Sequence, residues 1–162
     1  MPFKIGGQPR EIDLSEKSSK IVQRSWPAAK FAILSMSRKY IHTIYTRELS
    51  RQQCNDCLAE LISVLKSRQV MEIEMMFGWA WGNEYKDWTP FMVSTNDIAT
   101  EIDKAEQSGA GNFYNDDTFF YLKEWHCQIL FCHEFDIHLD FDENNNLVDD
   151  IIGRWKKKRI LN

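Results

Sequence analysis

Residues 125–142 read WHCQILFCHEFDIHLDFD, and this stretch decides which kind of fold the chain can form. It is rich in aromatic and β-branched residues but is too long for one ordinary strand, which usually spans about 3–10 residues. We therefore divide it at a turn near Glu134. In the second half, Ile137, Leu139 and Phe141 alternate with polar residues, as in a strand with one buried face. The stretch predicts a hairpin with an apolar face and an acidic face.

Further strands are predicted where aromatic and β-branched residues are dense. They are a hairpin over 30–36 and 40–46, two strands within 69–94 around a turn at Gly82-Asn83, and a strand over 118–122. Pro90 cannot donate a backbone hydrogen bond, so it indicates a strand at the edge of a sheet.

Three segments carry apolar residues at helical spacing. The first begins at Ser50, which forms a capping box with Gln53. The second follows a capping signal at 94–97 and ends before Gly109, and the third runs over 147–155. With the strands, these helices predict an α+β fold: an antiparallel sheet of about five to seven strands with two or three helices packed against it.

Composition narrows the class of protein. The 162 residues, 43% of them hydrophobic, suffice for one packed domain over 21–162, with a polar N-terminal arm over 1–20. A formal charge of -4 argues against a nucleic-acid binder, and the basic cluster at 156–159 is expected to be a solvated helix end. No apolar run has the length of a signal peptide or a membrane span. We therefore expect a cytoplasmic protein with no membrane contact, whose four cysteines are thiols.

Zinc coordination is the first chemistry that the cysteines and histidines raise. In HCQILFCH, residues 126–133, Cys127 and Cys132 point to opposite faces of an extended strand. Cys127 and His133 share a face but lie about 20 Å apart at the usual rise of a strand. The CNDC pair at 54–57 falls on the inner stripe of a helix, a full turn after its start. Neither zinc binding nor thioredoxin-like redox chemistry is expected there.

Calcium is the second metal to consider. DFDENNNLVDDI, residues 140–151, places acidic and asparagine residues at the first, third and fifth positions of an EF-hand-like loop. Ile151 stands where such a loop needs its bidentate glutamate. An acidic turn is the better account, and we expect no metal and no cofactor.

Acid–base catalysis is the third possibility, with His133, Glu134 and His138 as the candidate set. No nucleophile elbow, H-E-x-x-H motif or phosphate-binding glycine loop accompanies them. His133 is read most simply as a buried or turn histidine bonded to the backbone. The pattern favours a scaffold over a catalytic site.

Two sets of residues are candidates for binding a partner or a ligand. One is the acidic side of the hairpin: Glu134, Asp136, His138, Asp140 and Asp142. The other is an aromatic segment that includes Trp79, Trp81, Tyr85 and Trp88. Tryptophan and tyrosine combine a large contact area with a polar group, which suits interfaces, although core packing also accounts for part of this set.

The stretch DDTFFYLKEWHCQILFCHEFDIHLDF, with its DDTFFYL strand and a hairpin turn carrying HEFD, resembles small bacterial orphan proteins. Proteins of that kind occur as toxin-immunity proteins or on mobile gene cassettes. The resemblance covers the last third of the chain and implies a stoichiometric binding protein rather than an enzyme.

These observations predict a non-enzymatic cytosolic protein that binds a protein partner. The partner is either a toxin that the chain neutralises or another copy of the chain, bound through the aromatic surface. The acidic side of the hairpin would meet a basic partner, with Trp79, Trp81 and Trp88 as anchors. The alternative is a small-molecule-binding protein or hydrolase-like enzyme, whose aromatic-walled pocket has His133, Glu134 and His138 at its mouth.

Overall fold

A computed structural model describes residues 39–78, 89–109 and 111–162 of the chain. Its elements are β1 (His42–Tyr45), α2 (Arg51–Ser67), β2 (Glu72–Gly78), β3 (Phe91–Ser94), α3 (Ile98–Gln107), β4 (Asp117–Leu122), the short 3-10 helix η3 (Lys123–Trp125), β5 (Cys127–Phe131), β6 (Ile137–Phe141) and α4 (Asn146–Lys158). None of the helices in these ranges has the length and apolar character needed to cross a membrane.

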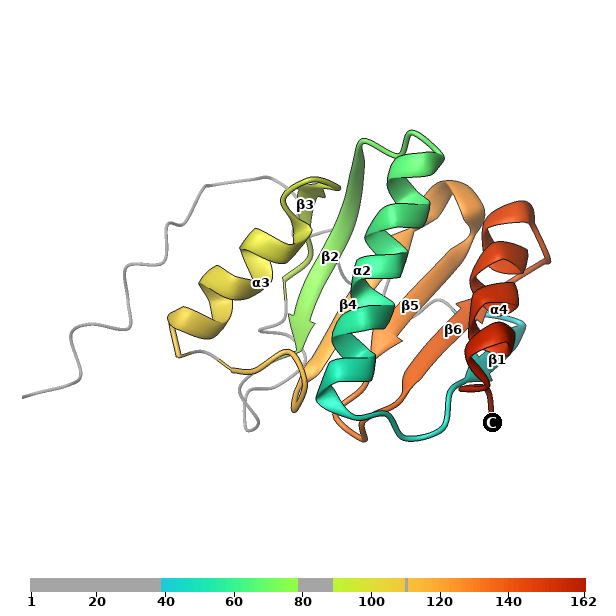
Figure 1. The fold of residues 1–162 in the computed structure, drawn as a ribbon. Helices are drawn as coiled ribbons and strands as arrows, with labels where there is room; N and C mark the ends of the chain where they lie inside the picture. The colour runs from blue at the N-terminus through green and yellow to red at the C-terminus, as the bar shows by residue number, and fades with distance from the viewer. Residues whose placement is uncertain (1–38, 79–88, 110) are drawn as a thin grey trace, which may run out of the picture.

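The strands form one open antiparallel sheet in the order β1-β6-β5-β4-β2-β3 (Figure 1). The predicted α+β fold with an antiparallel sheet is confirmed. β3 lies at an edge, as Pro90 indicated, and β5 and β6 form the hairpin predicted from 125–142. The segment 40–46 supplies β1, which pairs with β6. Its predicted hairpin partner at 30–36, and the turn at Gly82-Asn83, lie outside the described residues.

The starts of the helices follow the capping chemistry of the sequence only in part. At α2 the predicted capping box is present: the Gln53 N–H donates to Ser50 Oγ, and the Ser50 N–H donates to Gln53 Oε1. At α4, Asn145 Oδ1 accepts hydrogen bonds from two backbone N–H groups, each at 3.0 Å. At α3 the cap residue is Asp97, and its side chain makes no capping hydrogen bond. The signal at 94–97 therefore marks where α3 begins without supplying a side-chain cap.

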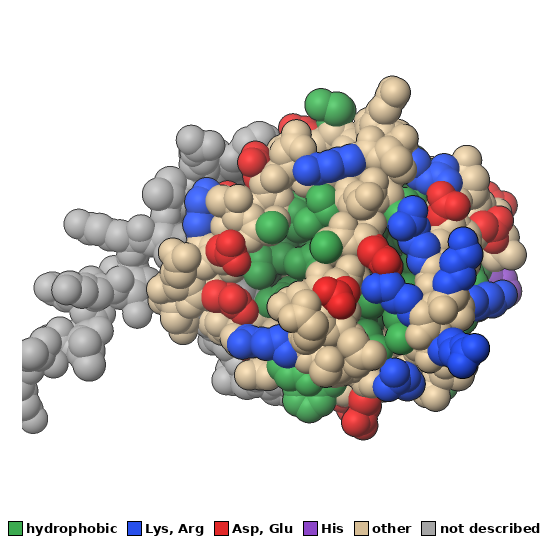
Figure 2. All heavy atoms as spheres, viewed as in Figure 1, with side chains coloured by type: hydrophobic (Ala, Val, Ile, Leu, Met, Phe, Trp, Pro, Cys, Tyr) green, Lys and Arg blue, Asp and Glu red, His purple; other side chains and the backbone are tan. Residues whose placement is uncertain are grey.

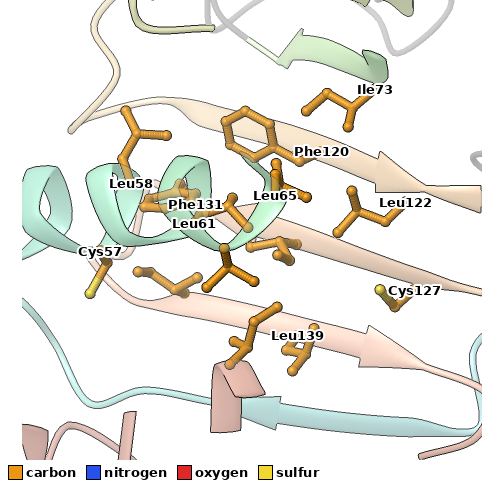
Figure 3. Close-up of a cluster of buried hydrophobic side chains, with 14 of the residues drawn as sticks. Cys57, Leu58, Leu61, Leu65, Ile73, Phe120, Leu122, Cys127, Phe131 and Leu139 are labelled. Carbon is orange, nitrogen blue, oxygen red and sulfur yellow. The ribbon is translucent and has the colours of Figure 1, made fainter. Parts of the chain in front are cut away.

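The hydrophobic core lies between the sheet and the helices, and α2, α3 and α4 pack on the same sheet face (Figure 1). Figure 3 shows Leu61 and Leu65 of α2 against Phe120, Leu122 and other strand side chains. Leu65 and Phe120 are fully buried. Burying a side chain of this size stabilises the fold by roughly 1.5–3 kcal/mol, so this layer carries most of the apolar stabilisation.

The opposite side of the sheet, here called the far face, is formed by side chains that alternate with the core residues. Cross-strand pairing arranges them in two rows. One row is Thr43, Asp140, Gln128, Tyr121, Glu74 and Met92, and the other is Tyr45, His138, Leu130, Phe119 and Met76. The far face is thus mixed, with acidic and histidine side chains on β6 and apolar ones toward β2 and β4.

Candidate functional site at the β5–β6 turn

The turn between β5 and β6 is the most densely functionalised part of the described chain. The Phe135 N–H donates to the Cys132 carbonyl at 3.0 Å, and the Cys132 N–H donates to the Asp136 carbonyl at 2.9 Å. This confirms a turn where the sequence predicted one. Phe135 has a φ of +68°, which is costly for a bulky side chain. Its ring stacks on Tyr114 at 4.8 Å, and its carbonyl accepts the Leu49 N–H at 2.7 Å, and these contacts hold that conformation.

Asp117 anchors the turn from the neighbouring strand. Thr118 pairs with Phe131, so Asp117, one residue earlier in β4, lies opposite the end of β5. Its Oδ1 accepts the His133 backbone N–H at 2.9 Å and contacts the His133 ring at Nδ1 at 2.8 Å. His133 is therefore a turn histidine, as expected, and its ring contacts the Asp117 carboxylate. The strand parity that placed it on the apolar face ends at the turn.

Cys132 lies at the centre of this arrangement and is only 8% exposed. Its Sγ is 3.8 Å from His133 Nδ1 and accepts the Glu134 N–H at 3.5 Å. The pKa of the thiol is raised to about 12, mainly by burial; the Glu134 N–H acts to lower it, and the nearby Asp117 and Asp136 carboxylates act to raise it. The thiol is therefore protonated at neutral pH.

A second pair completes the group on the other side of Cys132. His138 Nε2 lies 3.0 Å from Asp136 Oδ1, and the His138 ring lies 6.0 Å from that of Tyr45 across the β1–β6 ladder. We call Asp117, Cys132, His133, Asp136 and His138 the Cys132 cluster. It comprises two sets of three potential ligands that share Cys132, and within each set the ligand atoms lie within 4.8 Å of one another.

The geometry does not activate Cys132 as a nucleophile. A cysteine nucleophile needs a histidine base that accepts the thiol proton at one ring nitrogen while a third group orients the other. Here the same nitrogen, His133 Nδ1, faces both the thiol and the Asp117 carboxylate. The raised pKa of Cys132 also argues against nucleophilic attack, because it keeps the thiol protonated and the thiolate is the reactive form.

The residues predicted from the sequence are only partly brought together. Asp136 and His138 belong to the Cys132 cluster, whereas Glu134 is exposed in the turn. Asp140 lies farther along β6, where it accepts hydrogen bonds from Thr43 Oγ1 at 2.7 Å and Gln128 Nε2 at 3.2 Å. Asp142 follows β6, and its N–H donates to the His126 carbonyl. Trp79, Trp81, Tyr85 and Trp88 lie outside the described residues.

Asp117 and the central position of Cys132 were not predicted from the sequence. Asp117 is 15 residues before Cys132 in the chain, and only the β4–β5 register brings the two together. The available signal was the pair of acidic residues just before the strand predicted over 118–122, in DDTFFYL, but acidic residues are common at the ends of surface strands.

A groove between α2 and α3 is a separate candidate for ligand binding. It has a volume of about 350 Å³, and its apolar lining includes Leu58, Ile62 and Ile102. Figure 2 shows hydrophobic side chains gathered on this side of the molecule. Arg51 and Glu106 stand at its side with an N–O distance of 3.9 Å. Its lining contains none of the histidines predicted to stand at a pocket mouth, so it is not the pocket that the sequence analysis expected.

Comparison of the chain with protein-family models, curated proteins and solved structures finds no match. The site must therefore be interpreted from its own geometry.

Proposed function

We propose that the chain is a non-enzymatic cytosolic protein that binds a basic protein partner through the β1–β6 part of the far face. The observation that carries the proposal is the pair of cross-strand contacts Tyr45–His138 and Thr43–Asp140, which place the exposed Tyr45 ring on the same part of the far face as the Asp140 carboxylate.

Exposure and charge at this patch suit a protein interface. Tyr45 is 48% exposed, and Ile41, just before β1, is 74% exposed. Asp136 and Asp140 supply negative charge beside them. Aromatic side chains are enriched in interface centres, and complementary charge speeds association and selects the partner.

The acidic groups are also held in place before any partner arrives. Asp140 is fixed by Thr43 and Gln128, and Asp136 is fixed by His138. Groups that are already ordered lose less side-chain entropy on binding, which favours affinity for a given contact area. A toxin with a basic surface, neutralised one to one, is the kind of partner that the resemblance to immunity proteins implies. The proposal does not depend on the tryptophans outside the described residues.

Site-specific photo-crosslinking tests this function. A benzophenone amino acid replaces Tyr45 in one variant and Ser63, exposed on α2, in the matched control. We expect the Tyr45 variant, in extract of the native host, to crosslink to one defined polypeptide that the Ser63 variant does not capture. The purified polypeptide should then bind the unmodified chain one to one, with association slowed by added salt.

A pair of substitutions then separates specific from adventitious capture. Tyr45→Ala should weaken binding of the purified polypeptide, and Asp140→Asn should slow its association. Unchanged binding by both variants contradicts the proposal. Crosslinks formed only between copies of the chain contradict it as well, and favour self-association instead.

A further inference from the structure

The Cys132 cluster combines donor types that one class of metal ion prefers. It offers a thiol sulfur, imidazole nitrogens and carboxylate oxygens, drawn from β4, the β5–β6 turn and β6. Zinc is bound in proteins by this mixture of sulfur, nitrogen and oxygen ligands, whereas calcium and magnesium prefer oxygen alone.

The distances are close to those that a tetrahedral zinc ion imposes. Metal–sulfur and metal–nitrogen bonds of about 2.3 and 2.1 Å at the tetrahedral angle separate the two ligand atoms by about 3.6 Å. Cys132 Sγ and His133 Nδ1 are 3.8 Å apart. Asp117 Oδ1 is 2.8 Å from the same nitrogen, where about 3.4 Å is needed, so a small movement of this side chain completes the arrangement.

The surroundings also differ from those of an ordinary acidic surface. The side chains of Asp117 and Asp136 are 14% and 16% exposed, and each offers an oxygen within 4.8 Å of Cys132 Sγ. Carboxylates gathered around a buried sulfur repel one another, and a dication at the centre offsets that repulsion and binds the sulfur as a thiolate. The His133 side chain is 34% exposed, which leaves an entry path from solvent.

We propose that the Cys132 cluster binds one zinc-like divalent transition-metal ion, with Cys132, His133 and Asp117 as its three protein ligands and the fourth position open to solvent. No metal was expected from the sequence, because an extended strand over 126–133 would separate the ligands. The turn places Cys132 and His133 side by side, and Asp117 joins them from β4. This site goes beyond the proposed binding function and does not depend on it.

Metal titration of the full chain tests the site. The protein is stripped with a chelator and titrated with Zn²⁺ by calorimetry, and with Co²⁺ by absorption spectroscopy. We expect one equivalent of each ion, and thiolate-to-cobalt charge-transfer bands that report sulfur ligation. Cys132→Ser should abolish those bands, and His133→Ala should weaken Zn²⁺ binding roughly tenfold or more.

Matched controls use residues of the same types away from the cluster. Cys127→Ala, a buried cysteine at the start of β5, and His42→Ala, an exposed histidine on β1, should leave stoichiometry and affinity unchanged. If Cys132→Ser does not fold, as judged by circular dichroism, His133→Ala decides the question. Absence of stoichiometric binding in the parent, or full binding in the folded variants, overturns the site. Partner binding through Tyr45 is measured in a separate crosslinking experiment, so a negative result for one proposal does not contradict the other.

Discussion

The two faces of the sheet are built from the same six strands but hold the molecule together in different ways. The helix-covered face is a continuous apolar layer with side chains such as Leu65, Phe120 and Leu139 fully buried. The far face near β1 and β6 is held by polar contacts instead, among them Asp140 with Thr43 and Gln128. The first arrangement fixes the fold, and the second presents ordered polar groups to solvent. The following predictions test this division, in order of decreasing effect.

Phe120→Ala should produce the largest loss of stability. Phe120 is fully buried beneath α2 and packs edge-on against Phe131 at 5.6 Å. Removing a buried aromatic ring costs about 3–5 kcal/mol in transfer and cavity terms. The free energy of unfolding, measured by urea denaturation, checks the value. Met92→Ala, at an exposed far-face position, is the control and should change it by less than about 0.5 kcal/mol. Equal losses in the two variants would contradict the division between faces.

Alkaline pH should cause the second-largest loss of stability, because buried thiols lie in the helix-covered layer. Burial raises the pKa of Cys54 and Cys127 to about 12 and that of Cys57 to about 11, from an ordinary value of 9.0. For an acid whose folded pKa is raised, the stabilising contribution is complete below the unfolded pKa. It is lost as pH rises through the window between the two values, here from about pH 9 to about pH 12.

The loss amounts to about 1.4 kcal/mol per thiol for each pH unit above the unfolded value. Urea denaturation at pH 8, 9 and 10 measures it, and Cys127→Ala should reduce the slope between pH 9 and 10. A slope that does not change in Cys127→Ala would show that this thiol does not titrate as its burial implies.

The helix starts offer a comparison of intermediate size. Asn145→Ala removes two hydrogen bonds to the first turn of α4 and should cost about 1 kcal/mol. Asp97→Ala changes a cap residue whose side chain makes no capping bond, so it should have a smaller effect. Thermal unfolding of the two variants gives the comparison. A larger loss of stability in Asp97→Ala than in Asn145→Ala would contradict the assignment of Asn145 as the stronger helix cap.

These contrasts also explain how much the sequence could predict. The capping box of Ser50 with Gln53 and the alternation of Ile137 with Leu139 are signals between residues close in the chain, and both predicted real elements. The Cys132 cluster depends on the register that places Asp117 beside the β5–β6 turn. No local pattern encodes that register, because it follows from how the whole sheet packs against the helices. The fold was therefore more accessible to sequence reasoning than the site.

Asp140→Asn should give the smallest change in stability and is the sharpest test of the far face. Asparagine keeps one acceptor oxygen for Thr43 or Gln128 but replaces the other oxygen with a donor, so one of these partly exposed contacts is lost. Removing a charge beside Asp136 and Asp142 relieves repulsion and offsets part of that loss, so the net change should stay below about 1 kcal/mol. Thermal unfolding in low and in high salt measures it, and the difference from the parent should shrink in high salt because exposed charges are screened. A loss as large as that of Phe120→Ala would show that Asp140 holds the fold together, and the far face would then have to be read as part of the scaffold rather than as a surface kept for binding.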